Sequence, residues 1–274
     1  MKTPTAFHLL INGAGVLIGL AVVGYVVYAA IRTEEEAPCA SRYPAPMRFA
    51  LLANDGKPLS PLELQARSGL REWGVIENAT VATDAEAPAG AALQVKLAKL
   101  ASQEESEGRP RNGIDFRWSV AGAKAATAAC LSYSVWLPDK FDFNAGGVLP
   151  GIAGGKPDTP SAFGTRLQWR VGGEAELAVA MSGAPFRPVN QPNFSLLPGR
   201  WTQVEQELVL NTPGAQDGLA RLWIDGKLRA EDATVAFRSD ARAGITGVIA
   251  DIGYWRPPSK PGELRLSAFE LAWR

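Results

Sequence analysis

Side chains able to do acid–base or metal chemistry are sparse in this chain. The sequence has one histidine, His8, beside a long apolar run, and two cysteines, Cys39 and Cys130. The place of His8 beside that run argues against a Ser-His-Asp triad, against a Cys-His pair and against a zinc site with a histidine ligand. The sequence therefore predicts no metal and no cofactor. Cys39 and Cys130 lie outside any CxxC motif, so they either form a disulfide in an oxidising compartment or stay as two buried thiols.

Between residues 165 and 181, polar and apolar residues alternate with period two, which places several polar side chains on one face. Arg166, Gln168 and Arg170 alternate with apolar residues, and Glu176 does so a few residues later. Side chains two apart on a strand point to the same side of a sheet. These four residues are candidates for a ligand-binding groove, because arginine suits planar anions such as carboxylates. The alternative is an ordinary solvent-facing sheet surface.

Three aromatic residues in the C-terminal part complete the candidate binding set. Trp223, Tyr254 and Trp255 could present flat faces to a sugar ring. Aromatic side chains also dominate the interiors of β-sandwiches, so the competing hypothesis is that they belong to the core.

The elements that would position these residues are strands. Glycine and proline punctuate the chain (28 and 20 residues), and Asp55-Gly56 and Asp225-Gly226 are typical of tight turns. Many evenly spaced strands predict two packed antiparallel sheets, an all-β sandwich, over residues 47–274. A helix is expected only at Pro61–Leu70, with Ala91–Leu100 as a second candidate. The predicted strands include 131–137, 165–171, 175–181, 201–210, 219–224 and 264–273.

The N-terminus reads as a membrane anchor. Residues 9–31 form an apolar run long enough to cross a bilayer as one helix, preceded by a short cytoplasmic segment at 1–8 and followed by a linker at 32–46. Lys/Arg placement favours the main domain outside the cytoplasm, which in a bacterium means a single-pass inner-membrane protein with a periplasmic domain. Gly15 and Gly19 have the spacing at which a second helix can pack closely. The net charge is zero, so no nucleic-acid partner is expected.

One ordered set of motifs is more specific than this pattern. It comprises Gly-Gly-Val-Leu-Pro-Gly at 146–151, Thr-Arg-Leu-Gln-Trp-Arg at 165–170, Pro-Gly-Arg-Trp-Thr at 198–202 and Leu-Trp-Ile-Asp-Gly-Lys at 222–227. In order and spacing it resembles the family 14 polysaccharide lyases, which include alginate and glucuronan lyases. The resemblance implies a concanavalin-like jelly-roll sandwich with a groove for an anionic sugar chain.

The same resemblance implies a chemistry that this chain has largely lost. Such lyases carry out β-elimination on a uronate, with a lysine in the Gly-Gly-Lys-Leu-Pro-Gly loop, a Ser-x-Arg pair and a Tyr-x-Tyr pair as the groups that look essential. Arg166 matches the arginine. The other positions carry residues that cannot move a proton: Val148, Gly164, Ala178 and Ala180.

Three functions remain open on the sequence. The first is a membrane-anchored, non-catalytic domain that binds an acidic polysaccharide. The second is an accessory subunit of a membrane protein complex, with the sandwich as its docking surface. The third is an active polyuronate lyase whose catalytic residues have moved elsewhere in the groove.

Overall fold

The computed structural model describes residues 18–24, 36–69, 72–97, 112–181, 184–189, 194–256 and 258–274. The chain divides into two units, Met1–Glu36 and Ala37–Arg274. In the first unit the described residues 18–24 are helical; the rest of the predicted anchor, including Gly15, lies outside the described residues. No helix within the described part of the chain has the length and apolar character needed to cross a membrane. The space around Gly19 is open.

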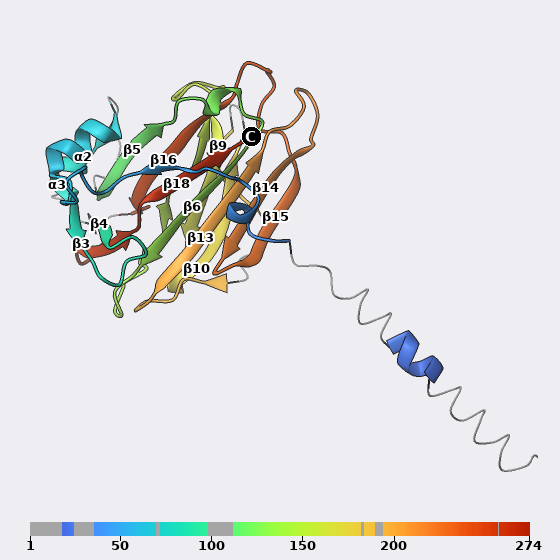
Figure 1. Cartoon of the computed structure of the whole chain (residues 1–274), viewed down its shortest axis with the longest axis horizontal. Helices are drawn as coiled ribbons and strands as arrows, with labels where there is room; N and C mark the ends of the chain where they lie inside the picture. The colour runs from blue at the N-terminus through green and yellow to red at the C-terminus, as the bar shows by residue number, and fades with distance from the viewer. Residues whose placement is uncertain are drawn as a thin grey trace, which may run out of the picture. The chain divides into compact units, whose positions relative to one another are not determined.

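The second unit is a sandwich of two antiparallel sheets, which confirms the predicted fold (Figure 1). We call the first sheet the strap sheet, after the N-terminal segment 37–43 that covers it. In the described residues its central order is β15-β14-β13-β6-β17-β4-β3. Strands β18 and β1 extend it, because β18 pairs with the first part of β6 and β1 pairs with β18. Its strands are β1 (Met47–Phe49), β3 (Ala79–Thr83), β4 (Ala91–Leu97), β6 (Ala128–Trp136), β13 (Trp201–Val209), β14 (Gly218–Ile224), β15 (Lys227–Val235), β17 (Gly262–Leu266) and β18 (Phe269–Trp273).

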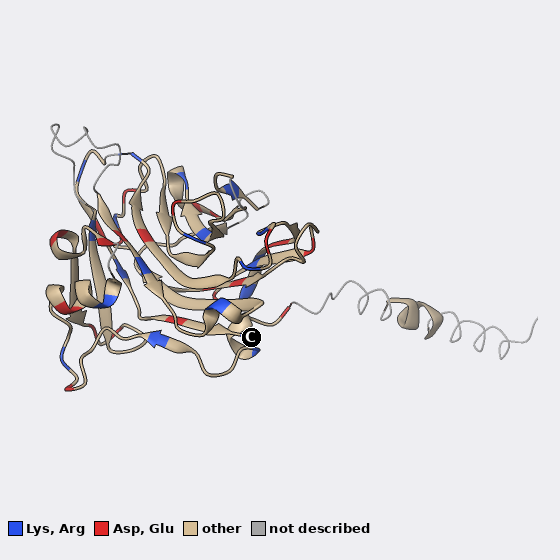
Figure 2. Ribbon diagram, turned by 90° about the horizontal axis from the view of Figure 1, so that it is seen from above, with Lys and Arg blue, Asp and Glu red and all other residues tan. Residues whose placement is uncertain are grey.

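The second sheet, which we call the groove sheet, has the order β11-β10-β9-β7-β16-β5-β2, with β12 and β8 beside this path. The strands of the sandwich curve, and acidic and basic residues intermingle along them (Figure 2). The groove-sheet strands are β2 (Glu72–Trp73), β5 (Gly113–Ser119), β7 (Gly147–Leu149), β8 (Gly151–Gly154), β9 (Phe163–Trp169), β10 (Glu174–Ala180), β11 (Arg187–Pro188), β12 (Phe194–Ser195) and β16 (Ile245–Tyr254).

Short helices lie in the connections. The predicted helix at Pro61 forms as α2 (Pro61–Ser68), where Ser60 and Glu63 make a reciprocal capping box. The second candidate helix was wrong: Ala91–Leu97 is strand β4, because Leu93, Val95 and Leu97 alternate into the core. The other short helices are α3 (Val75–Asn78), η1 (Cys39–Ser41), η3 (Ala123–Ala125) and η4 (Val171–Gly173).

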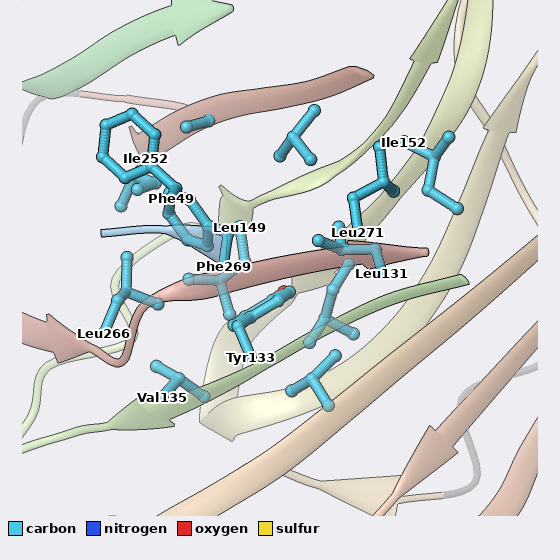
Figure 3. Packing of buried hydrophobic residues seen from close by; sticks show 14 of the residues in the cluster. Phe49, Leu131, Tyr133, Val135, Leu149, Ile152, Ile252, Leu266, Phe269 and Leu271 are labelled. Carbon is cyan, nitrogen blue, oxygen red and sulfur yellow. The ribbon is translucent and has the colours of Figure 1, made fainter. Parts of the chain in front are cut away.

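The core lies between the two sheets, and side chains from both point into it (Figure 3). Phe269 packs between Tyr133 and Phe116, with ring centroids 6.0 and 6.3 Å away. The segment 264–273 was predicted as one strand, but it breaks at Ser267 and Ala268 into β17 and β18. The break reverses the alternation, so that Leu266 and Phe269 both enter the core. An unbroken strand would have turned one of them to solvent.

Residues 37–43, which we call the N-terminal strap, cover the outer face of the strap sheet (Figure 1). A disulfide joins Cys39 to Cys130 in β6. The Ala40 amide donates a hydrogen bond to Glu205 at 2.8 Å. Arg42 and Tyr43 contact Glu207. Residues 37–46 of the predicted 32–46 linker are therefore part of the second unit, and the carboxylates on the outer face of β13 help to hold them there.

Burial raises the pKa of Glu205 above its ordinary value of 4.5. The protonated carboxyl is therefore favoured in the folded state, and its contribution to the free energy of unfolding is largest below the unfolded pKa and is lost as pH rises through the folded pKa. We expect Glu205→Gln to become progressively more stable than the wild type as the pH rises above about 4.5, the ordinary pKa of a glutamate. Urea titrations at several pH values measure this, with the exposed Glu231→Gln as control. A constant difference across pH would contradict the assignment.

Candidate functional site

The open face of the groove sheet carries the predicted polar residues. In β9 the side chains of Thr165, Leu167 and Trp169 are buried in the interior, so Arg166 and Gln168 point the other way. The hairpin to β10 sets the partners, because Arg166 is opposite Ala178 in the antiparallel register. On the same face Gln168 is opposite Glu176, and Gly164 is opposite Ala180.

Two glycines make this hairpin possible. Gly172 and Gly173 link β9 to β10 with φ of 76° and 87°, a left-handed conformation that favours glycine. A Cβ on Gly173 would also lie 2.6 Å from the ring of Phe143. The turn therefore fixes the register that places Arg166 against Ala178.

Two adjoining clefts open on this face, and Arg166 lines both. The first, which we call the tryptophan cleft, has a volume of about 460 Å³. Its lining includes Trp73, Asp115, Val148, Arg166, Asp251 and Trp255. The second, the phenylalanine cleft, has a volume of about 450 Å³ and is lined by Arg117, Asp158, Arg166, Ala180 and Phe186 among others. Since Arg166 is shared, the two clefts are parts of one groove along the sheet.

Arg166 is held from two sides. Its Nη1 donates to Oδ2 of Asp251 on β16 at 2.5 Å. Its guanidinium lies over the ring of Phe186, 4.5 Å from the centroid. The side chain is only 17% exposed, compared with 31% for Asp251. These contacts fix the guanidinium at the junction of the two clefts.

The second predicted arginine also has a partner within the protein. Arg170 contacts Glu176 at 2.8 and 2.9 Å through Nη2 and Nε. The Glu176 side chain is 2% exposed, and its hydrogen bond raises the pKa of Arg170. Gln168, half-buried, lies on the same face beside this pair. Neither cleft is lined by Gln168, Arg170 or Glu176, so this end of the predicted site lies beyond the groove.

Of the three aromatic candidates, Trp255 faces the groove as predicted. It is 39% exposed and lines the tryptophan cleft. The prediction for Trp223 was wrong: it is fully buried on the strap sheet, below Arg42 of the N-terminal strap. Tyr254 borders the cleft, but its ring packs in the core.

The phenol of Tyr254 is committed to the protein. It donates a hydrogen bond to the carbonyl of Asp142 at 2.6 Å, and burial raises its pKa to about 12. Tyr133, a second possible acid, is buried and donates to the Pro150 carbonyl. Burial raises the pKa of Tyr133 as well. Neither phenol is available to exchange a proton with a ligand in the groove.

The positions that the lyase resemblance marks as chemical come together on this face. Val148 lines the tryptophan cleft, Ala180 lines the phenylalanine cleft, and Ala178 lies opposite Arg166. Ala178 is fully buried. Among the described residues that line the two clefts there is no lysine and no histidine. Lys140 lines a different cleft, and Lys156 lines neither half of the groove.

Several groove residues escaped the sequence analysis. Asp115 and Arg117 lie on β5, where Ile114, Phe116 and Trp118 alternate with them. That alternation was a usable signal. For Asp251 the sequence carries no such signal, because its neighbours in β16 are apolar residues or glycine on both faces of the strand. Burial lowers the pKa of Arg117, while Asp115, Asp158 and Asp251 act in the opposite direction.

Comparisons with known proteins agree with this fold. The sequence profile described as Polysaccharide lyase 14 matches residues 85–254, more than half of the chain. The chain is similar to the crystal structure of a PL-14 alginate lyase from Aplysia kurodai, with 18% identity, a TM-score of 0.63 and coverage of 74% of this chain and 90% of that one. It is also similar to the alginate lyase vAL-1 from a Chlorella virus, with 15% identity, a TM-score of 0.66 and coverage of 83% of this chain and 100% of that one. The endo-β-1,4-glucuronan lyase from Trichoderma reesei has 10% identity and a TM-score of 0.54, with coverage of 76% of this chain and 90% of that one. No match was found among curated proteins.

These solved lyases share the two-sheet sandwich fold of this chain. The chain belongs to the polysaccharide lyase 14 family.

Proposed function

We propose that this protein binds a polysaccharide in the groove and does not cleave it by β-elimination. The observation that carries the proposal is the composition of the groove, where Arg166 remains but Val148, Ala178 and Ala180 stand where the family resemblance places the proton-transferring groups. β-Elimination needs a base for the proton next to the uronate carboxylate and an acid for the leaving oxygen. Valine and alanine can be neither.

Two features support binding. The tryptophan cleft has the size of a ligand site and combines apolar walls with a few polar groups. Trp255 is a large aromatic side chain left partly exposed beside that cleft, where a sugar ring could stack on it. The solved lyases with this fold are named for acidic polysaccharides. The prediction that this protein binds an acidic chain depends on whether its arginines can accept a uronate carboxylate, and both already contact carboxylates of the protein.

The test is a pair of measurements on the full-length protein. Incubation with alginate and glucuronan is followed by ultraviolet absorbance, which rises when elimination forms an unsaturated sugar. Affinity gels containing these polymers and neutral glucans report binding. We expect no absorbance change and retardation by at least one polymer. A rise that Arg166→Ala abolishes would restore the lyase, and retardation by none would favour the accessory-subunit function.

Replacing Trp255 should weaken binding strongly. An exposed aromatic anchor in a cleft is a typical hot spot, so Trp255→Ala is expected to raise the dissociation constant by about tenfold or more. The gel mobility across polymer concentrations measures this. Trp201→Phe, a change on the strap sheet, serves as the control and should leave binding unchanged. Equal retardation of Trp255→Ala and the wild type would remove Trp255 from the site.

We also propose that residues 9–31 anchor the protein in the bacterial inner membrane, with the sandwich in the periplasm. The apolar run supports the anchor. The Cys39–Cys130 disulfide supports an oxidising compartment. Fractionation of cells, with protease added to spheroplasts, tests both points, since the sandwich should be accessible from the periplasmic side and extracted from membranes only by detergent.

A further inference from the structure

The groove already holds a carboxylate on its arginine. Arg166 is the family-matching cation, and in a binding site for uronates it would pair with the sugar carboxylate. In this protein Asp251 makes that contact at 2.5 Å. Asp251 reaches from β16 to β9, two strands separated by β7 and β8. A carboxylate of the protein thus stands where a ligand carboxylate would be expected.

Displacing Asp251 from Arg166 would remove the ion pair that stabilises its charge in the groove. Asp251 lies directly opposite Asp115 in the register of β16 and β5. The ion pair of Asp251 with Arg166 offsets the repulsion from this like-charged neighbour. A uronate that took over Arg166 would bring a third carboxylate beside Asp115 and Asp251, which Coulomb repulsion disfavours in a partly buried site.

The charges around the whole groove point the same way. The described charged residues that line the two clefts are Arg117, Arg166, Asp115, Asp158 and Asp251. Three carboxylates and two guanidinium groups give these lining residues a net charge of −1, which offers a polyanion no net attraction. A chain of uncharged sugars meets no such repulsion. Its hydroxyl groups can donate to aspartate oxygens, and its rings can lie against Trp255.

On the basis of the proposed binding function, we infer that Asp251 sets the specificity of the groove. It occupies the carboxylate position on Arg166, so that the groove accepts an uncharged polysaccharide and rejects polyuronates. Asp251 acts on the ligand through Arg166 and through its own charge, and the Asp251→Asn variant removes both effects while keeping the size of the side chain.

The experiment compares variants of the full-length protein in affinity gels that contain hydroxyethylcellulose, a soluble β-1,3-glucan, alginate or glucuronan. We expect the wild type to be retarded by a neutral glucan and not by the polyuronates. Asp251→Asn should bind a polyuronate at least tenfold more tightly than the wild type does, in a manner that salt weakens. Adding Arg166→Ala to Asp251→Asn should abolish that gain.

The matched control is Asp158→Asn, which removes one negative charge from the same groove and leaves the Arg166–Asp251 pair intact. If Asp158→Asn gains polyuronate binding as large as that of Asp251→Asn, or if the wild type already binds polyuronates as tightly, the role of Asp251 is wrong while the binding function stands. If Asp251→Asn binds a polyuronate but the wild type binds no neutral glucan, the ligand class is wrong. Retardation of no variant by any polymer would overturn the binding function itself.

Discussion

Glu207→Ala is expected to lower the free energy of unfolding by about 3–5 kcal/mol. The Glu207 side chain is 1% exposed on β13 and accepts from Arg42 at 2.9 Å and from Tyr43 at 2.8 Å. Arg221 lies 3.5 Å away. Removing the carboxylate takes away the acceptor of the buried Tyr43 hydroxyl and a charged partner of Arg42, and losing such an acceptor in a buried site is costly. Urea denaturation of the full-length protein measures the loss.

The control for this prediction is Glu231→Ala. Glu231 also contacts Arg221, at 2.5 Å, but its side chain is 41% exposed. An exposed ion pair contributes about 0–1 kcal/mol, so the control should change little. A loss in Glu207→Ala as small as the one expected for Glu231→Ala would show that the contacts of Glu207 with the N-terminal strap contribute little to stability.

Loss of the disulfide is expected to have an effect of similar size. Cys39 and Cys130 are 91 residues apart in the sequence, and closing so long a loop removes much conformational freedom from the unfolded chain. We expect Cys39→Ala/Cys130→Ala to lower the free energy of unfolding by about 2–5 kcal/mol. Urea denaturation with and without reductant measures it. The wild type should lose stability on reduction and the double variant should not; coinciding curves for the oxidised and reduced wild type would contradict the prediction.

The sequence predicted the fold well wherever the alternation of apolar residues within a single strand identifies its buried face. Period-two alternation in 131–137 identifies the buried face of β6, because alternate side chains point to opposite sides whatever the neighbouring strands are. The same logic placed Arg166 and Gln168 on the open face of β9. It failed at Val171, where the alternation of the predicted strand 165–171 puts the side chain on the same face as Leu167 and Trp169. Val171 is 69% exposed, since the strand ends at Trp169 and η4 follows.

The site could be predicted only in part, because its chemistry depends on which strands are neighbours. Arg166 and Asp251 are 85 residues apart, and no local pattern indicates that they meet. Trp223 occupies a strand position that would be open to solvent if the N-terminal strap did not cover it. Alternation assigns a residue to a face, but the order of the strands and the covering segments decide what that face contacts.

The N-terminal strap also determines how the domain would bear mechanical tension. A pull applied at Ala37 reaches the disulfide at Cys39 and passes through Cys130 into β6. Strand β6 is hydrogen-bonded to β13 on one side and to β17 and β18 on the other, so extracting it means shearing two ladders at once. Residues 40–129, which include the three-residue strand β1, lie inside the loop closed by the disulfide, so they carry none of this tension. Tension from the N-terminal side therefore loads the centre of the strap sheet and spares β1, the shortest of its described strands.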